Sequence, residues 1–405
     1  MKNSILLFAF FSLMLFSCLG DETETEPIVE EETGWIKHPE YLNANKIIRG
    51  LYELEDNLIS LHDFGYGVKS YFDRGSFSQL NFFGLSIPDA GLRVHMPFNQ
   101  SFPINDKFMV FNIVERPNSI FVYSLNEPTS LSTSSNGLEI KGSEIDPNFR
   151  VFNFIFKSTG NAFELNGNFI LLSYSVNNDP SMPLRFAIIE VEQNTTSGFR
   201  VGTELISINT FKSPQKEGLL GNGVMSMLSV EDGFIISTWF SLFKVDFEGN
   251  IKEFEKNNIY NGREQYGQSY LVKDPRTNVI ICADATELTD SYYSTDDGES
   301  WSVLADYNQQ DSFFNLNRLY YRELNGDLYG TNSSQIFKVS ITPNSFILDE
   351  LDNSGLEGHE ITGISSYYQD SLVMVSTYSG AFYKPSADFL KPKISDSMGL
   401  FSGGF

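Results

Sequence analysis

Short apolar runs separated by turn-forming residues recur along the chain, and they restrict its fold more than any other feature. Residues 234–238, 242–247 and 372–376 are examples, with the length and the β-branched and aromatic content of strands. The turns between such runs contain Gly, Asn and Asp, as at residues 248–250, which is the composition of tight hairpins. Helical periodicity is hard to find, so the sequence predicts an all-β protein.

Three of the predicted hairpins share one pattern: Ser or Thr, five residues, an aromatic residue and then Lys. The pattern starts at Ser237, Thr331 and Thr377 and ends at Lys244, Lys338 and Lys384. These positions imply a period of about 47 residues, which falls within the range of β-propeller repeats. A missing copy is expected near residue 284, where the apolar run 280–283 supplies a strand.

The same pattern predicts seven repeat units, beginning near residues 57, 106, 168, 233, 278, 326 and 370. Each unit is expected to be a four-stranded antiparallel blade of a single β-propeller, with six and eight blades as alternatives. Residues 35–52 are expected to supply the outermost strand of the last blade and to close the ring. Because a propeller is one domain, residues 35–405 are predicted to form a single domain.

A specific motif lies in the fifth unit, where residues 294–301 read Ser-Thr-Asp-Asp-Gly-Glu-Ser-Trp. Its defining positions are Ser294, Asp296, Gly298 and Trp301. The motif resembles the Asp-box, or BNR repeat, of sialidases and many other propellers. That resemblance implies a structural hairpin between the third and fourth strands of a blade, in which the Asp and Ser oxygens bond to the turn, the Gly takes a positive φ and the Trp packs between sheets. Residues 246–250 are at most a degenerate copy.

The sequence offers no catalytic signature. Sialidases carry an early Arg-Ile-Pro or Arg-Val-Pro signature and several Asp-boxes, whereas this chain has neither tripeptide and one clear box. The four histidines, His38, His62, His95 and His359, show no metal-binding spacing. No catalytic residue, metal site or cofactor is therefore predicted, although a carboxylate pair of a glycoside hydrolase remains an alternative that only geometry can test.

The N-terminus has the pattern of a bacterial lipoprotein. Lys2 precedes an apolar run over residues 5–16, which is too short to span a bilayer but suits a secretory signal. Residues 15–18, Leu-Phe-Ser-Cys, resemble the lipobox of bacterial lipoproteins. The resemblance implies a signal peptide over residues 1–17 and a diacylglycerol on the thiol of Cys18, which would make the membrane a partner. An ordinary cleaved signal or an uncleaved anchor is the alternative.

Residues 18–34 are predicted to form an acidic, disordered tether. Residues 21–32 contain seven acidic residues and no basic one, so like charges repel and little can be buried. Acidic residues soon after a lipidated Cys resemble the surface-export signal of some Gram-negative lipoproteins. We therefore expect an outer-membrane lipoprotein exposed at the cell surface, with a periplasm-facing orientation as the alternative.

Charge and cysteine content narrow the expected partners. The 52 acidic against 28 basic residues give a net charge of −24, which argues against nucleic acid as a partner because that affinity comes mostly from cations on phosphates. The hydrophobic content of 41% allows a large core. Cys18 and Cys282 are the two cysteines, so no disulfide framework is expected, and Cys282 is predicted to be an inert, buried thiol.

The aromatic residues provide the remaining binding candidates. Most of the 36 Phe and 19 Tyr are expected to pack between blades, because successive strand residues point to opposite faces. Trp239 and Tyr378 follow Thr238 and Thr377 at matching repeat positions and are predicted to face a ligand.

We therefore expect a lipid-anchored envelope propeller that binds an extracellular glycan or a protein, as a monomer or as a subunit of an envelope complex. A carbohydrate-active propeller enzyme and a scaffold subunit of an outer-membrane complex are the alternatives.

Overall fold

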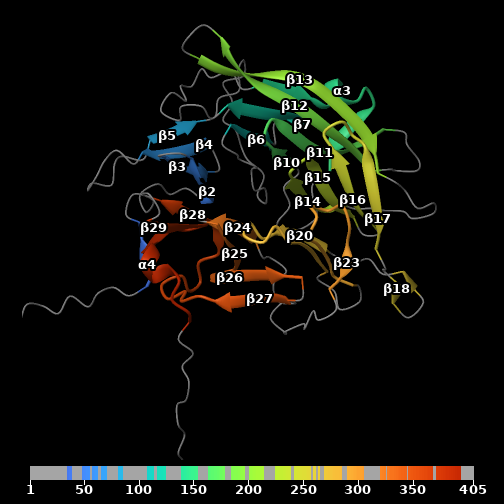
Figure 1. Cartoon of the computed structure of the whole chain (residues 1–405). Helices are drawn as coiled ribbons and strands as arrows, with labels where there is room; N and C mark the ends of the chain where they lie inside the picture. The colour runs from blue at the N-terminus through green and yellow to red at the C-terminus, as the bar shows by residue number, and fades with distance from the viewer. Residues whose placement is uncertain are drawn as a thin grey trace, which may run out of the picture. The chain divides into compact units, whose positions relative to one another are not determined.

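Figure 1 shows the computed structural model of the chain. It describes residues 34–38, 48–54, 57–62, 65–70, 81–84, 107–113, 116–124, 138–153, 163–177, 184–196, 200–213, 224–238, 241–256, 259–260, 263–264, 269–284, 290–304, 320–324, 326–343, 345–367 and 371–393. The chain divides into two units, Met1–Gly34 and Trp35–Phe405, and the described residues other than Gly34 belong to the second.

The prediction of an all-β protein is confirmed. Apart from the four-residue helices α3 (Gly142–Ile145) and α4 (Ser386–Phe389), all described regular structure is antiparallel β. Neither of these short helices could cross a membrane, and no other helix is present in the described part of the chain.

Seven antiparallel sheets of three or more strands contain nearly all of the described strands. We number the sheets in chain order. Sheet 1 contains β2 (Ile48–Leu54), β3 (Asn57–His62), β4 (Gly65–Ser70) and β5 (Asn81–Gly84). Sheet 2 contains β6 (Phe108–Ile113), β7 (Arg116–Ser124) and β8 (Leu138–Lys141). Sheet 3 contains β9 (Phe149–Phe152), β10 (Phe163–Asn166), β11 (Phe169–Val176), β12 (Arg185–Thr196) and β13 (Arg200–Lys212).

The later sheets have four strands each. Sheet 4 contains β14 (Val224–Val230), β15 (Gly233–Thr238), β16 (Ser241–Asp246) and β17 (Ile251–Glu255). Sheet 5 contains β20 (Ser269–Lys273), β21 (Ile280–Asp284), β22 (Tyr292–Ser294) and β23 (Ser302–Val303). Sheet 6 contains β24 (Tyr320–Leu324), β25 (Asp327–Asn332), β26 (Gln335–Thr342) and β27 (Ser345–Glu350). Sheet 7 contains β28 (Ile361–Tyr367), β29 (Leu372–Thr377), β30 (Gly380–Pro385) and β1 (Ile36–Lys37), and a separate ribbon contains β18 (Ile259–Tyr260) and β19 (Arg263–Glu264).

The repeated hairpin of the sequence is confirmed as the second and third strands of sheets 4, 6 and 7. The copy expected near residue 284 is β21, the second strand of sheet 5. The expected four strands are present in five sheets, but sheet 3 has five strands and sheet 2 has three in the described residues. The unit predicted near residue 106 begins with the first strand of sheet 2 rather than the second, because β6 and β7 have the same apolar character and do not reveal their rank.

The expected outer strand of the last sheet is confirmed, in a shorter form. β1 pairs with β30 through Ile36↔Tyr383 and Lys37↔Phe382, whereas residues 48–54 form the first strand of sheet 1. Trp35, just before β1, is only 6% exposed and meets the ring of Phe389 edge-on at 5.9 Å. The N-terminal strand is therefore fixed to the C-terminal sheet by both pairing and packing.

Buried apolar clusters join sheets that follow one another in the chain. They connect sheets 2 and 3, 3 and 4, 4 and 5, 5 and 6, and 6 and 7, and a further cluster connects sheet 7 with sheet 1. The last of these contains Leu51 and Leu58 of sheet 1 together with Met374 of sheet 7. Cys282 lies in the cluster between sheets 4 and 5 and is 1% exposed, which confirms its predicted burial.

Candidate functional site

The turns of the sheets define two ends at which side chains gather. In an antiparallel sheet with hairpin connections, the turn between strands one and two lies at the same end as the turn between strands three and four. We call this the motif end, because residues 295–301 of sheet 5 lie there. The turn between strands two and three lies at the other end, which we call the opposite end.

The predicted Asp-box residues lie in the turn between β22 and β23, the third and fourth strands of sheet 5. The Ser294 hydroxyl donates to Asp296 Oδ1 at 2.8 Å and accepts the Gly298 N–H at 2.9 Å. Asp296 also accepts the N–H and the hydroxyl of Ser300, at 2.9 and 2.5 Å. Burial opposes ionisation of Asp296, but the hydrogen bonds from Ser300 and Ser294 outweigh it and lower the pKa of this carboxyl.

The same turn packs directly against sheet 4. Gly298 has a φ of 86°, and a Cβ added to it would lie 2.5 Å from Cδ1 of Ile235 in β15. The half-buried ring of Trp301 packs on the apolar cluster between sheets 4 and 5. These contacts give the turn a structural part in joining two sheets.

The turn at residues 246–250 of sheet 4 repeats the carboxylate half of this arrangement. Asp246 Oδ1 accepts the N–H groups of Glu248 and Asn250 at 3.0 and 2.8 Å, and Oδ2 accepts the Asn250 amide at 2.8 Å. Burial opposes ionisation, but these hydrogen bonds hold the pKa of Asp246 below its usual range. Lys244 stands where the first motif has Ser294, so the hydroxyl half is missing.

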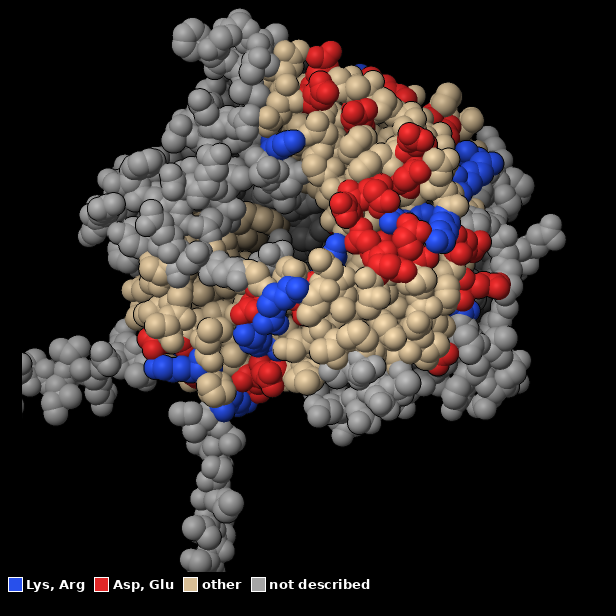
Figure 2. All heavy atoms as spheres, viewed as in Figure 1, with Lys and Arg blue, Asp and Glu red and all other residues tan. Residues whose placement is uncertain are grey.

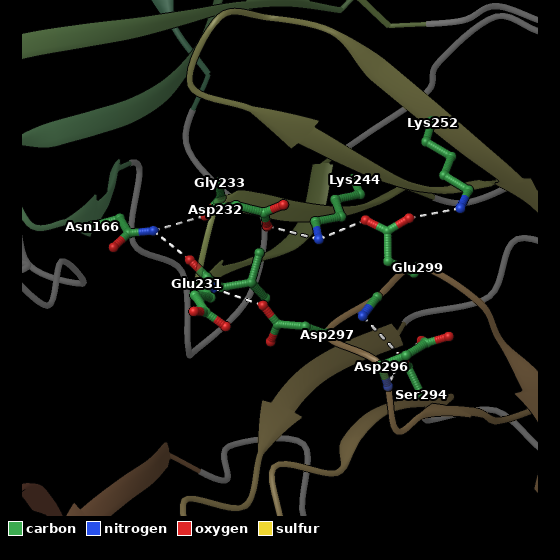
Figure 3. Close-up of polar contacts among 12 residues, drawn as sticks. Asn166, Glu231, Asp232, Gly233, Lys244, Lys252, Ser294, Asp296, Asp297 and Glu299 are labelled. Carbon is green, nitrogen blue, oxygen red and sulfur yellow. Dashed lines mark hydrogen bonds and ion pairs between the residues drawn. The ribbon is translucent and has the colours of Figure 1, made fainter.

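Lys244 instead forms the centre of a charged cluster between sheets 4 and 5 (Figure 3). Its side chain is 7% exposed, and Nζ lies 2.7 Å from Asp232 and 2.8 Å from Glu299. The second oxygen of Glu299 lies 2.7 Å from Lys252. Burial alone would lower the pKa of Lys244, but its two carboxylate partners raise it. In turn, hydrogen bonds from Lys244 and Lys252 lower the pKa of Glu299.

Further polar contacts link neighbouring turns at the motif end. The Asn166 amide of sheet 3 donates to the Val230 and Gly233 carbonyls of sheet 4 at 2.6 and 2.9 Å. Asp297 of sheet 5 accepts the Glu231 N–H of sheet 4 at 2.7 Å (Figure 3).

Sheet 5 is linked to sheet 6 in a similar way. The Arg276 guanidinium of sheet 5 lies 2.7 Å from Asp327 of sheet 6, which also pairs with Lys338 at 2.9 Å. Figure 2 shows acidic and basic side chains side by side on the described surface. At the motif end the charges therefore largely satisfy one another.

Of the two predicted ligand-facing aromatics, Tyr378 is described and Trp239 lies outside the described residues. Tyr378 stands in the turn between β29 and β30, at the opposite end of sheet 7, and is 39% exposed. Thr377 Oγ1 accepts the Ser379 N–H at 3.1 Å and donates to the Gly380 carbonyl at 2.9 Å. These bonds close the turn beneath the exposed ring.

Thr238, the repeat equivalent of Thr377, closes the corresponding turn of sheet 4. Its hydroxyl donates to the Ser241 carbonyl and accepts the Ser241 N–H, both at 3.1 Å. The two threonines therefore act alike, as their matching places in the repeat suggest.

His359 joins the Tyr378 turn from the connection between β27 and β28. Its Nδ1 lies 2.6 Å from the Ser379 hydroxyl, and its ring centroid lies 4.8 Å from that of Phe382. Lys37 of β1 lies over the same Phe382 ring at 5.8 Å. The sequence analysis assigned no role to His359, because its partner stands 20 residues further along the chain.

A second polar cluster at the opposite end is enclosed between sheets 4 and 5. The Lys256 ammonium donates to the Ser237 hydroxyl at 2.8 Å and to the Thr238 carbonyl at 2.7 Å, and Cys282 Sγ lies 3.8 Å from the Ser237 hydroxyl. Ser237 is 0% and Lys256 is 9% exposed. This lysine–serine pair is buried, so it stabilises the junction of the sheets rather than meeting a substrate. No group of three metal-ligating side chains occurs in the described part of the chain.

Comparison with known proteins gives structural likeness alone. No protein-family model and no curated protein matches the chain. One similar solved structure is PorZ, a surface component of the type-IX secretion system of Porphyromonas gingivalis, with 8% identity, a TM-score of 0.46 and coverage of 85% of this chain and 37% of PorZ.

Another is the extracellular domain of BT4673 from B. thetaiotaomicron, a protein assigned to the hybrid two-component systems. Its identity is 10%, its TM-score is 0.43 and the match covers 87% of this chain and 39% of that one. The chain thus spans about two fifths of the length of these structures, 37% and 39%.

Proposed function

We propose that residues 35–405 form one seven-bladed β-propeller, anchored to the outer membrane through a lipid on Cys18, which acts as a binding module at the cell envelope. The observation that carries the fold is the packing of consecutive sheets on one another, with sheet 7 also packed on sheet 1. A sheet order that returns to its start is what a propeller requires. The placement of β1 in sheet 7 supports the same closure.

The lipid anchor rests on the sequence of residues 1–34. A Cys18→Ala variant should remain as unlipidated precursor or be released from the membrane, whereas Cys282→Ala, a change at the buried cysteine, should fractionate like the wild type. Metabolic labelling with a fatty acid and fractionation of membranes measure both. Equal membrane association of the Cys18→Ala and wild-type proteins would contradict the anchor.

The surface orientation rests on the acidic residues 21–32. Protease added to intact cells should digest the wild-type chain, whereas replacement of these acids by Ser and Gly should retain it inside the outer membrane. Protection of the wild-type chain in intact cells, with digestion only after the outer membrane is permeabilised, would establish the periplasmic orientation instead.

A binding role is supported by the contrast between the two ends of the sheets. At the motif end the described charges pair with one another, as Lys244 does with Asp232 and Glu299. At the opposite end, Tyr378 is exposed above a turn that Thr377 closes. An exposed aromatic ring on a rigid turn is suited to contact a ligand.

The test is a binding screen with the purified, full-length chain in detergent. A glycan array and a pulldown of extracellular and envelope proteins cover the two classes of ligand. Saturable binding of one glycan or one protein supports the proposal. Release of shortened sugars from an array glycan would replace it with a glycan-cleaving enzyme, and the absence of any saturable ligand would refute it.

A further inference from the structure

We propose that the turn between β29 and β30 is a subsite for a sugar ring of a neutral glycan. Tyr378 would provide the stacking surface, and Ser379 and His359 would provide hydrogen bonds to hydroxyl groups. The inference rests on the proposed binding function and specifies its ligand class. It is carried by the contacts around this turn.

The exposed ring of Tyr378 stands apart from exposed aliphatic side chains. The other large hydrophobic residues exposed in the described part of the chain are Ile206, Ile251, Val303, Ile347 and Leu390. The first four lie on sheets 3, 4, 5 and 6, and Leu390 follows α4, beyond the far end of β30. Protein-binding hot spots lie at the centre of a larger, water-excluding contact surface, so an isolated ring fits the small apolar face of a sugar better.

The turn is held in place before any ligand arrives. Thr377 Oγ1 accepts the Ser379 N–H and donates to the Gly380 carbonyl, and Thr377 itself is 0% exposed. Because these bonds fix the backbone on either side of Tyr378, little conformational entropy remains to be lost on binding.

Polar groups that suit hydroxyl ligands lie beside the ring. The Ser379 hydroxyl lies 2.6 Å from His359 Nδ1, and the imidazole is held against Phe382 with a centroid distance of 4.8 Å. A serine hydroxyl both donates and accepts, and a neutral imidazole has one donor and one acceptor nitrogen. The two groups therefore match sugar hydroxyls, which also donate and accept.

The charges nearby favour a neutral ligand over an acidic one. The connection that carries His359 also carries Glu357, which accepts the Gly355 N–H at 2.8 Å, and Glu360. Lys37 is the basic residue near Phe382. Two carboxylates against one ammonium repel uronic and sialic acids more than they attract them.

The experiment titrates the full-length chain with cellohexaose, maltohexaose and mannohexaose as neutral probes and with a hyaluronan hexasaccharide as the acidic probe. Isothermal calorimetry should detect binding of at least one neutral probe. Tyr378→Ala should weaken that binding about tenfold or more, as expected for loss of a central aromatic contact. Tyr378→Phe should keep it within about threefold, because the ring is retained.

The matched control is Leu390→Ala, which removes another exposed side chain of the same part of the chain and should leave binding unchanged. Thermal unfolding should be the same for all variants, because each changed side chain is exposed. If a neutral probe binds equally to Tyr378→Ala and wild type, the subsite is refuted while the binding function stands.

Two further results would overturn the ligand class. One is tighter binding of the hyaluronan probe than of any neutral probe. The other is a protein ligand lost on Tyr378→Ala when no sugar binds. If neither sugars nor proteins bind the wild-type chain, the proposed function itself fails.

Discussion

Replacement of Gly298 by Ala tests whether the motif turn of sheet 5 joins two sheets. Gly298 has a φ of 86°, and the added methyl would lie 2.5 Å from Cδ1 and 2.9 Å from Cγ1 of Ile235. Ile235 is 0% exposed within the apolar cluster of sheets 4 and 5, so it has little room to turn away. We expect about 1–2 kcal/mol for the left-handed backbone and about 1–3 kcal/mol for overpacking.

Gly326→Ala is the matched control, because it changes a glycine of another turn at the motif end. Its φ is 75°, and an added Cβ would have no neighbour within 4 Å. It should therefore cost only the backbone part, about 1–2 kcal/mol. Urea denaturation followed by tryptophan fluorescence measures the free energy of unfolding of both variants.

The reasoning requires Gly298→Ala to destabilise the protein more than Gly326→Ala does, by about 1–3 kcal/mol. Adding Ile235→Val to Gly298→Ala should recover part of that difference, because a smaller side chain makes room for the methyl. Equal destabilisation by the two glycine substitutions would refute the proposed contact between the sheets.

Two further predictions concern the charged groups of the turns. Lys244→Met should lower the free energy of unfolding by about 1–2 kcal/mol, because two charge-assisted contacts of a buried ammonium are lost, whereas Lys252→Met, at a side chain that is 61% exposed, should change it by less than about 1 kcal/mol; equal effects in urea denaturation would contradict this ranking. The pKa values of Asp246, Asp296 and Asp352 are lowered because their hydrogen bonds outweigh the effect of burial, so stability should be complete above about pH 5 and should fall as the pH drops below about 4, through the folded-state values. Asp296→Asn should flatten this fall, and an acid-unfolding curve parallel to that of the wild type would count against the assignment.

Local sequence patterns predicted much of the fold, because they act within one hairpin. The pattern that ends at Lys244, Lys338 and Lys384 identified second and third strands of three sheets. It could not show that β9 and β10 divide the first position of sheet 3. Alternation reports that a strand is half-buried but not its rank within a sheet.

The candidate sites show the same division between near and distant contacts. The bonds of Asp296 reach Ser294 and Ser300, only a few residues away, and a motif can indicate them. The partners of Lys244 include Glu299, and His359 meets Ser379; both pairs depend on how sheets and connections pack. The exposure of Tyr378 followed from its place in the repeat, directly after a threonine that closes the turn.

The central claim, that the N-terminal strand completes the C-terminal sheet of one closed body, is tested most directly by comparing two truncated chains. One lacks residues 1–34, and the other lacks residues 1–38 and with them Trp35 and β1. Loss of the buried Trp35 alone should cost about 3–5 kcal/mol, so the shorter chain should unfold at a clearly lower urea concentration. The same unfolding midpoint for both chains would contradict the account.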